Sequence, residues 1–189
     1  MRVETAEIVD PVPVKGGIIN GCARISWDSQ KRPLITFHKF DENGKTQAYC
    51  ARVENGKWKS YQVSDWDCRW YFEGGGSIQS EIHLGGATAA GKGKLALDYD
   101  HSEYGRGRLI FDERTLKPLS TEPAPPRGWP GALDKTESAF PGMAVKILQR
   151  GNYIPRWETL PPNRDRAREG ALPDPSMLRL YELEPTRAN

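Results

Sequence analysis

The chain has 189 residues, a formal net charge of +2 at pH 7 and 37% hydrophobic residues. The length suits one ordinary domain, and the small, evenly mixed charge argues against a nucleic-acid partner. No apolar run reaches the roughly 18 residues of a membrane helix, so no membrane partner is expected. Nineteen glycines and fifteen prolines favour many turns and short strands over long helices.

The three cysteines, Cys22, Cys50 and Cys68, are widely separated and form no CxxC pair. Structural zinc sites use closely spaced pairs and disulfide frameworks use even numbers, so we predict neither, and no metal or cofactor. The thiols are interpreted as small buried apolar residues. Residues 1–17 lack the apolar core of a signal peptide. The compartment is therefore left open, and is extracellular or periplasmic if the chain belongs to a longer exported protein.

From residue 22 the chain carries short runs rich in β-branched and aromatic residues, separated by turn formers such as Asn-Gly. Four strands on about 40 residues are typical of one blade of a β-propeller. The pattern predicts a first blade over 22–63 and a second over about 66–117. The predicted strands are 22–28, 33–40, 46–53 and 57–64 in the first blade, and 77–84, 94–101 and 108–114 in the second.

Beyond the second predicted blade, residues 118–142 are rich in Pro and Gly and predict a long irregular loop. Closing strands are expected within 143–183. We therefore predict an all-β fold: a single partial propeller domain over 1–189, with four-stranded antiparallel blades and long Pro/Gly-rich loops. Closed propellers have about four to eight blades, so N-terminal blades are expected to be missing, or the chain to self-associate.

The stretch SDWDCRWYFEGGGSI, residues 64–78, alternates apolar and polar side chains. If residues 65–73 are extended, period-two alternation separates them into two faces. One face carries Trp66, Cys68, Trp70 and Phe72, and the other carries Asp65, Asp67, Arg69, Tyr71 and Glu73. Glycines 74–76 would let the backbone bend or approach another segment closely.

The segments ITFHKFDENGKTQAYCARVENGKWKSYQVSDWDCRWYFEGGGSI and YIPRWETLPPNRDRAREGALPDPSMLRLYEL resemble the C-terminal part of the BNR-repeat-containing propeller family. That family includes ulvan-lyase-like polysaccharide lyases. The resemblance implies a bacterial, often exported protein with further blades. It also implies β-elimination across a uronic-acid linkage by histidine, tyrosine and arginine. DENGKTQAY loosely resembles the Asp-box turn of sialidase-type propellers, but with a different spacing.

Three residues are catalytic candidates. Arg69 has a planar fork that suits a substrate carboxylate, and Tyr71 on the same face suits an acid or base. His38, near the end of a strand, could act as a base near neutral pH. The structural alternatives are an ion pair of Arg69 with Asp67 or another carboxylate, and a hydrogen-bonded strand histidine.

Four residues are substrate-binding candidates. Trp58 and Trp129, like Trp157, could stack on sugar rings, although tryptophans in such folds more often pack in the core. His101 and Tyr104 share a polar turn. The leading hypothesis is a carbohydrate-active propeller fragment that acts on an acidic, uronate-containing polysaccharide by β-elimination. The alternative is a non-catalytic glycan-binding or structural propeller module.

Overall fold

The computed structural model describes residues 6–19, 21–72 and 76–184. Within these ranges the chain forms twelve strands and one short 3-10 turn, which confirms the all-β prediction. No helix in the described ranges is long and apolar enough to cross a membrane. The chain divides into two compact units, whereas a single domain was expected. Unit 1 is Met1–Glu73 with Ser80–Pro125, and unit 2 is Gly74–Gln79 with Pro126–Asn189.

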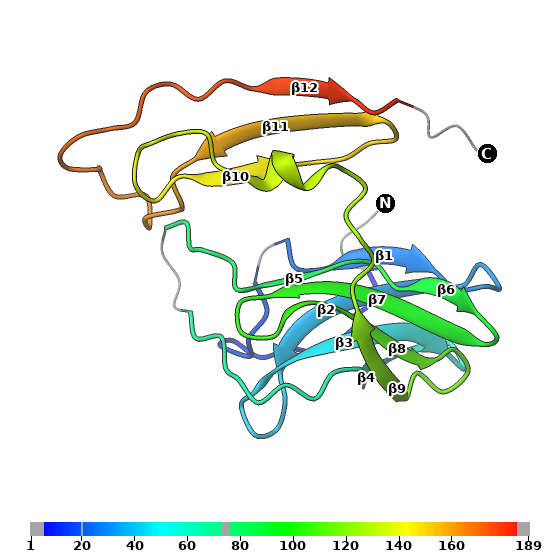
Figure 1. Cartoon of the computed structure of the whole chain (residues 1–189). Coiled ribbons are helices and arrows are strands. Elements are labelled where there is room, and N and C mark those ends of the chain that lie inside the picture. Colours follow the sequence, from blue (N-terminus) through cyan, green and yellow to red (C-terminus); the bar gives the residue numbers. More distant parts are fainter. Residues whose placement is uncertain (1–5, 20, 73–75, 185–189) are drawn as a thin grey trace. The chain divides into compact units, whose positions relative to one another are not determined.

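The first sheet of unit 1, sheet A, is an antiparallel meander of four strands in chain order (Figure 1). The strands are β1 (Arg24–Trp27), β2 (Pro33–Phe40), β3 (Thr46–Glu54) and β4 (Lys57–Gln62). They coincide with the four runs of β-branched and aromatic residues noted in the sequence. Strand β3 is buried on both faces from Thr46 to Arg52, so it forms the centre of the blade.

Matching aspartate turns lie at the two ends of β2. The Oδ1 atoms of Asp28 and Asp41 each accept hydrogen bonds from the backbone N–H two and four residues later, all at 2.9 Å. The third residue after each aspartate, Lys31 or Gly44, has a left-handed backbone with φ of 63° or 77°. Because aspartate readily hydrogen-bonds nearby backbone groups, these turns fix where β2 begins and ends.

The second sheet of unit 1, sheet B, has the order β5-β7-β8-β9, with β6 also paired to β7. Strand β5 pairs with the C-terminal half of β7 and β6 with its N-terminal half, so the sheet is four positions wide. Strands β6 and β9 lie in segments that were expected to be a turn and an irregular loop. The strands are β5 (Ile82–Leu84), β6 (Thr88–Gly91), β7 (Lys94–His101), β8 (Gly105–Asp112) and β9 (Pro118–Pro123).

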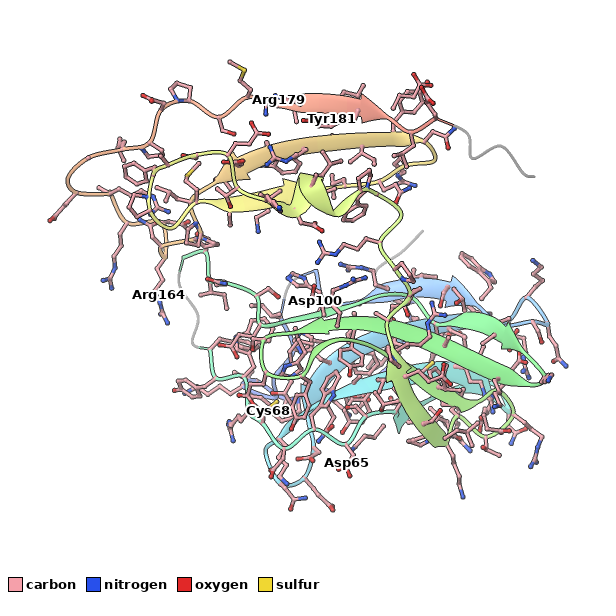
Figure 2. All side chains as sticks on the ribbon, in the orientation of Figure 1. Asp65, Cys68, Asp100, Arg164, Arg179 and Tyr181 are labelled. Carbon is pink, nitrogen blue, oxygen red and sulfur yellow. The ribbon has the colours of Figure 1, made fainter. Side chains whose placement is uncertain are left out.

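Side chains from both sheets fill the space between sheets A and B (Figure 2). The hydroxyl of Thr36 on β2 donates to the Gly85 carbonyl at 2.7 Å, and Gly86 lies against Ser26 of β1, where a Cβ would meet the serine Cβ at 2.9 Å. The core of sheet B is apolar, with the side chains of Leu95, Leu97 and Phe111 fully buried.

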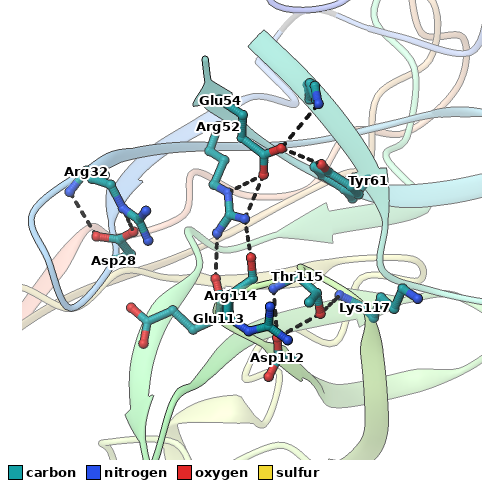
Figure 3. A network of polar contacts seen from close by, with 11 residues as sticks. Asp28, Arg32, Arg52, Glu54, Tyr61, Asp112, Glu113, Arg114, Thr115 and Lys117 are labelled. Carbon is teal, nitrogen blue, oxygen red and sulfur yellow. Dashed lines mark hydrogen bonds and ion pairs between the residues drawn. The ribbon is translucent and has the colours of Figure 1, made fainter. Parts of the chain in front are cut away.

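Arg52 on β3 joins the two sheets through polar contacts (Figure 3). Its guanidinium donates to the carbonyl of Glu113 at 2.5 Å and to the carbonyl of Arg114, both in the β8–β9 turn. It also pairs with Glu54 at 2.6 Å, and Glu54 accepts a hydrogen bond from Tyr61 at 2.8 Å. The planar fork of arginine suits such a set of acceptors, so one side chain connects the outer parts of both blades.

Unit 2 contains sheet C, an antiparallel sheet with the order β10-β11-β12. Its strands are β10 (Ala144–Ile147), β11 (Tyr153–Thr159) and β12 (Arg179–Glu182), and the 3-10 turn is Gly131–Asp134. The short segment Gly74–Gln79 belongs to the same unit. Ser77 N–H donates to the Asp165 carboxylate at 3.0 Å, and Arg164 N–H donates to the Ser77 carbonyl at 2.8 Å.

Candidate functional site

The segment 63–72 runs beside the first half of β3 without forming a strand. The side-chain amide of Gln47 takes the place of ladder hydrogen bonds: Oε1 accepts from Trp66 N–H at 2.9 Å and Nε2 donates to the Trp66 carbonyl at 2.9 Å. Further along, Thr46 N–H donates to the Cys68 carbonyl at 2.8 Å, and Thr46 Oγ1 accepts from Trp70 N–H at 2.9 Å. The segment is therefore fixed beside the first residues of β3.

The expected alternation of side chains holds although no strand is present. Trp66 and Trp70 are buried, while Cys68 and Phe72 are half-buried. The opposite face exposes Asp65, Asp67, Arg69 and Tyr71. Asp65 and Cys68, which represent the two faces, are labelled in Figure 2. Glu73, Gly74 and Gly75 lie outside the described residues. Gly76 has φ of 73°, and a side chain there would overlap the backbone of Arg164 within unit 2.

Arg69 and Tyr71 lie on the solvent-facing side of the segment. The Arg69 guanidinium lies over the ring of Phe40 at 4.3 Å and against the β2–β3 turn at Gly44. In the described part of the chain it has no carboxylate partner, because Asp67 pairs with Lys45 at 2.9 Å instead. Tyr71 is 66% exposed. The proposed Arg69–Asp67 bridge is thus absent, and Arg69 is available to an external anion.

The charges around Arg69 are mixed. Asp67 pairs with Lys45, and the hydrogen bond to Asp67 raises the pKa of Lys45. Asp41 accepts backbone hydrogen bonds within its turn. Asp65 and Glu42 are the remaining nearby carboxylates in the β2–β3 turn and segment 63–72. An open pocket of about 340 Å³ lies beside them and is lined by Asp41, Glu42, Asn43, Lys45, Tyr49, Gln62 and Asp65. This surface offers carboxylate acceptors from three residues and donors from the amides, the ammonium and the phenol of the other four.

His38 lies inside unit 1, with only 1% of its surface exposed. Its Nδ1 is 2.9 Å from the Gly17 carbonyl, so Nδ1 carries the proton and donates. Its Nε2 is buried and has no hydrogen-bond partner among the described residues. The ring packs against Trp70 at 5.2 Å. Burial lowers the pKa of His38, partly offset by the Gly17 carbonyl. His38 is therefore a neutral core residue, away from the surface that holds Arg69.

His101 and Cys68, which are 33 residues apart, meet at the end of β7. The Nε2 atom of His101 is 3.2 Å from Cys68 Sγ, and its Nδ1 accepts from the backbone N–H of Glu103 at 3.0 Å. Because Nδ1 accepts, the ring proton is on Nε2 and points at the sulfur. Burial raises the pKa of the Cys68 thiol to about 11 and lowers the pKa of His101. The pair is a neutral thiol and a neutral imidazole, without an activated nucleophile.

An aromatic cluster surrounds His101. The ring of Trp66 lies 4.8 Å from His101, 5.2 Å from Tyr99 and 6.2 Å from Tyr104. The Tyr104 hydroxyl accepts from Asp67 N–H at 2.7 Å, which joins the β7–β8 turn to segment 63–72. Of the two substrate-binding candidates in this turn, Tyr104 is partly exposed and His101 is buried.

The two tryptophan candidates lie in different units. Trp58 of β4 packs on the cluster of Phe37, Tyr49 and Ala51, and its Nε1 donates to Glu7 at 2.6 Å. Trp129 in unit 2 donates to Asp134 at 3.1 Å and has Arg127 over its ring at 5.5 Å. Each indole is engaged by contacts within its own unit.

The sequence reasoning missed a buried ion network in unit 2. Arg156, 1% exposed, pairs with Glu158 at 2.7 Å and lies 3.3 Å from Glu137, which also pairs with Arg179 at 2.5 Å. Glu158 accepts from the backbone N–H of Glu137 and Ser138, and these bonds lower its pKa. The sequence did contain a signal for this network: Arg156 and Glu158 stand two residues apart in one predicted strand, so they share a face.

No group of three or more His, Cys, Asp or Glu side chains in the described ranges is arranged to hold a metal ion. Cys22, Cys50 and Cys68 are free thiols. At the site, Asp65, Arg69 and Tyr71 offer groups for hydrogen bonding, ion pairing and ring stacking.

Residues 1–66 match the family model described as BNR repeat-containing family member. The matched range contains all of sheet A and ends at Trp66, within segment 63–72. Searches of the curated proteins and of the solved structures found no match. The match supports the BNR-repeat resemblance over the first third of the chain, and with it a carbohydrate-related module of the β-propeller type.

Proposed function

We propose that unit 1 is a carbohydrate-binding propeller module that recognises uronate-containing polysaccharide through Arg69 and Tyr71. The observation that carries this proposal is the placement of Arg69. Its guanidinium is exposed, is held over the ring of Phe40 at 4.3 Å and has no carboxylate partner among the described residues. A preorganised guanidinium loses little conformational freedom on binding a carboxylate.

Tyr71 and Asp65 complement Arg69 on the same face of the segment. A tyrosine ring offers a face for the C–H side of a pyranose, and a carboxylate accepts hydrogen bonds from sugar hydroxyls. The family match supports a carbohydrate ligand, whereas the specific preference for uronate rests on Arg69.

The test compares polygalacturonate with its fully methyl-esterified form, which has the same backbone without the charge. In affinity electrophoresis, we expect the wild-type chain to be retained more strongly by polygalacturonate. Arg69→Gln should reduce that difference, and Tyr71→Ala should weaken retention by both polymers. Arg24→Gln is the matched control, since Arg24 is exposed on β1 and donates to the nearby carbonyls of Gly21 and Ala23. Equal retention of wild type and Arg69→Gln by polygalacturonate would contradict the proposal.

β-Elimination in a longer, lyase-like protein is the second candidate, because His38 keeps an unprotonated Nε2. We rank it lower, since the imidazole is buried and a base must reach the sugar proton. Incubation with ulvan, followed by absorbance of the unsaturated product, should give no signal for this chain. Product formation that disappears in His38→Gln would replace the binding proposal with a lyase.

A further inference from the structure

A row of ring side chains lies along one face of β11 in unit 2. Tyr153, Pro155 and Trp157 occupy alternate positions of this central strand and therefore share a face. Tyr153 is 51% exposed, while Pro155 and Trp157 are half-buried. At about 3.3 Å per residue, Tyr153 and Trp157 are about 13 Å apart along the strand. The row thus forms a narrow, elongated aromatic surface.

The opposite face of β11 supports this row rigidly. Ile154, Arg156 and Glu158 point into the interior of unit 2 and are buried. Arg156 donates to the Leu133 carbonyl at 2.9 Å and to the Lys135 carbonyl at 2.6 Å, which attaches the strand to the 3-10 turn and the residue after it. A strand fixed in this way presents its outer rings without reorganisation. Arg179 and Tyr181 of β12, labelled in Figure 2, pair with Arg156 and Ile154 and share the inner face.

Charged residues flank the row on the neighbouring strands. Lys146 of β10 lies opposite Trp157, and Glu182 of β12 lies opposite Tyr153. Cross-strand partners share a face, so both charged groups border the rings. Lys146 is exposed and forms no ion pair within the described residues. Between these charged groups, Leu180 of β12 lies opposite Pro155 and is 68% exposed. The face therefore has an apolar centre and charged ends, which suits a sugar chain whose rings pack on apolar groups while its polar groups bond at the ends.

We propose that the outer face of sheet C is a second glycan-binding site, with Tyr153 and Trp157 stacking on sugar rings and Lys146 contacting a carboxylate. The ligand is a linear polysaccharide that lies along β11. That this polysaccharide contains uronate rests on the proposed function. The position of the site rests on the row of Tyr153, Pro155 and Trp157. Lys146 provides the charge complementarity for an acidic chain at the Trp157 end.

The experiment uses the full chain carrying Arg69→Gln, so that residual binding reports on sheet C. Binding of polygalacturonate and of its methyl ester is followed by calorimetry and by tryptophan emission. We expect Tyr153→Ala to lower the affinity for both polymers about threefold to tenfold. Lys146→Gln should lower the affinity for polygalacturonate only. Trp157→Phe should remove the change in tryptophan emission while keeping part of the affinity. Trp27→Ala, half-exposed on β1, is the control and should change neither affinity.

The outcomes separate the two proposals. Residual binding that is unaffected by Tyr153→Ala and Lys146→Gln overturns the sheet C site. If Arg69→Gln alone abolishes all binding, the sheet C site is overturned and the Arg69 site is supported. Binding that depends on Tyr153 but not on Arg69 overturns the Arg69 site instead. Concentration-dependent dimers that Tyr153→Ala dissolves would identify the face as a protein interface and overturn the glycan site.

Discussion

The side-chain amide of Gln47 makes two hydrogen bonds to the backbone of Trp66, one to its N–H and one to its carbonyl, both at 2.9 Å. An amide group has the same donor and acceptor as a peptide unit, so Gln47 acts as a one-residue extension of the β-ladder. This pairing keeps residues 65–71 extended and their side chains alternating beyond the end of β4. It therefore sets the position of Arg69 and Tyr71.

Gln47→Leu should destabilise unit 1 by about 2–4 kcal/mol, because the side chain is fully buried and its loss removes the partners of the Trp66 N–H, the Trp66 carbonyl and the Ser64 hydroxyl proton. Urea unfolding measures the change in the free energy of unfolding. Hydrogen exchange of the Trp66 amide should also accelerate. The control is Gln62→Leu, since Gln62 is half-buried and donates one bond to Ser64. Equal effects of the two variants would argue against the role of Gln47.

Arg52→Lys should destabilise the packing of sheets A and B by about 3 kcal/mol, because an ammonium cannot reach the Glu54 carboxylate and two carbonyls in the same planar arrangement. Thermal unfolding followed by circular dichroism measures the loss. Arg32→Lys is the matched control: Arg32 is a half-exposed partner of Asp28, and we expect less than about 1 kcal/mol. A similar loss in both variants would contradict the assignment.

Stability should fall as the pH drops below about 6.5, because burial lowers the pKa of His38 below its ordinary value. The unfolded chain then binds a proton more readily than the folded chain. His38 therefore contributes full stability above its unfolded pKa and loses that contribution as the pH falls through its folded pKa. His101, whose pKa burial also lowers, acts in the same direction. Melting temperatures between pH 7.5 and 5 measure this effect.

The control for this pH effect is His38→Gln, whose amide can still donate to the Gly17 carbonyl. Its melting temperature should vary less with pH than that of the wild type over the same interval. Identical pH profiles for the two proteins would show that His38 does not carry the effect.

Asp65→Asn should strengthen retention by polygalacturonate by about twofold to threefold, because it removes a negative charge on the same face as Arg69. Retention by the methyl-esterified polymer should change little, because the asparagine carbonyl still accepts hydrogen bonds from sugar hydroxyls. The gain should shrink as salt is added, since exposed charges are screened. Affinity electrophoresis at two ionic strengths measures both effects. A gain that persists unchanged in high salt would indicate a structural cause.

Runs of β-branched and aromatic residues between turn formers predicted the strands that carry buried side chains. The strands of sheet A, β7 and β8 were recognised in this way. Strands β6 (TAAG) and β9 (PLSTEP) are exposed at every residue, so their sequences carry no burial signal. Their backbone pairing with β7 and β8 arises from tertiary context, which a local pattern does not contain.

The candidate site was predictable in part from the alternation of apolar and polar side chains in residues 65–73. Alternation placed Arg69 and Tyr71 on the polar face correctly, because it requires only an extended backbone. It placed His38 on a strand face but could not show that Gly17 and Trp70 pack against the imidazole. The contact between Cys68 and His101 depends on Trp66 packing across two sheets, and no spacing in the sequence contains it.

The membership of Gly74–Gln79 in unit 2 has a practical consequence for cutting the chain. The polypeptide passes from one unit to the other three times, after residues 73, 79 and 125. No single boundary separates the units. A truncation after Pro125 would retain Ser77 without the Asp165 carboxylate that accepts its hydrogen bonds. Isolating unit 1 cleanly therefore requires an internal replacement of residues 74–79 by a short linker as well as removal of everything beyond Pro125.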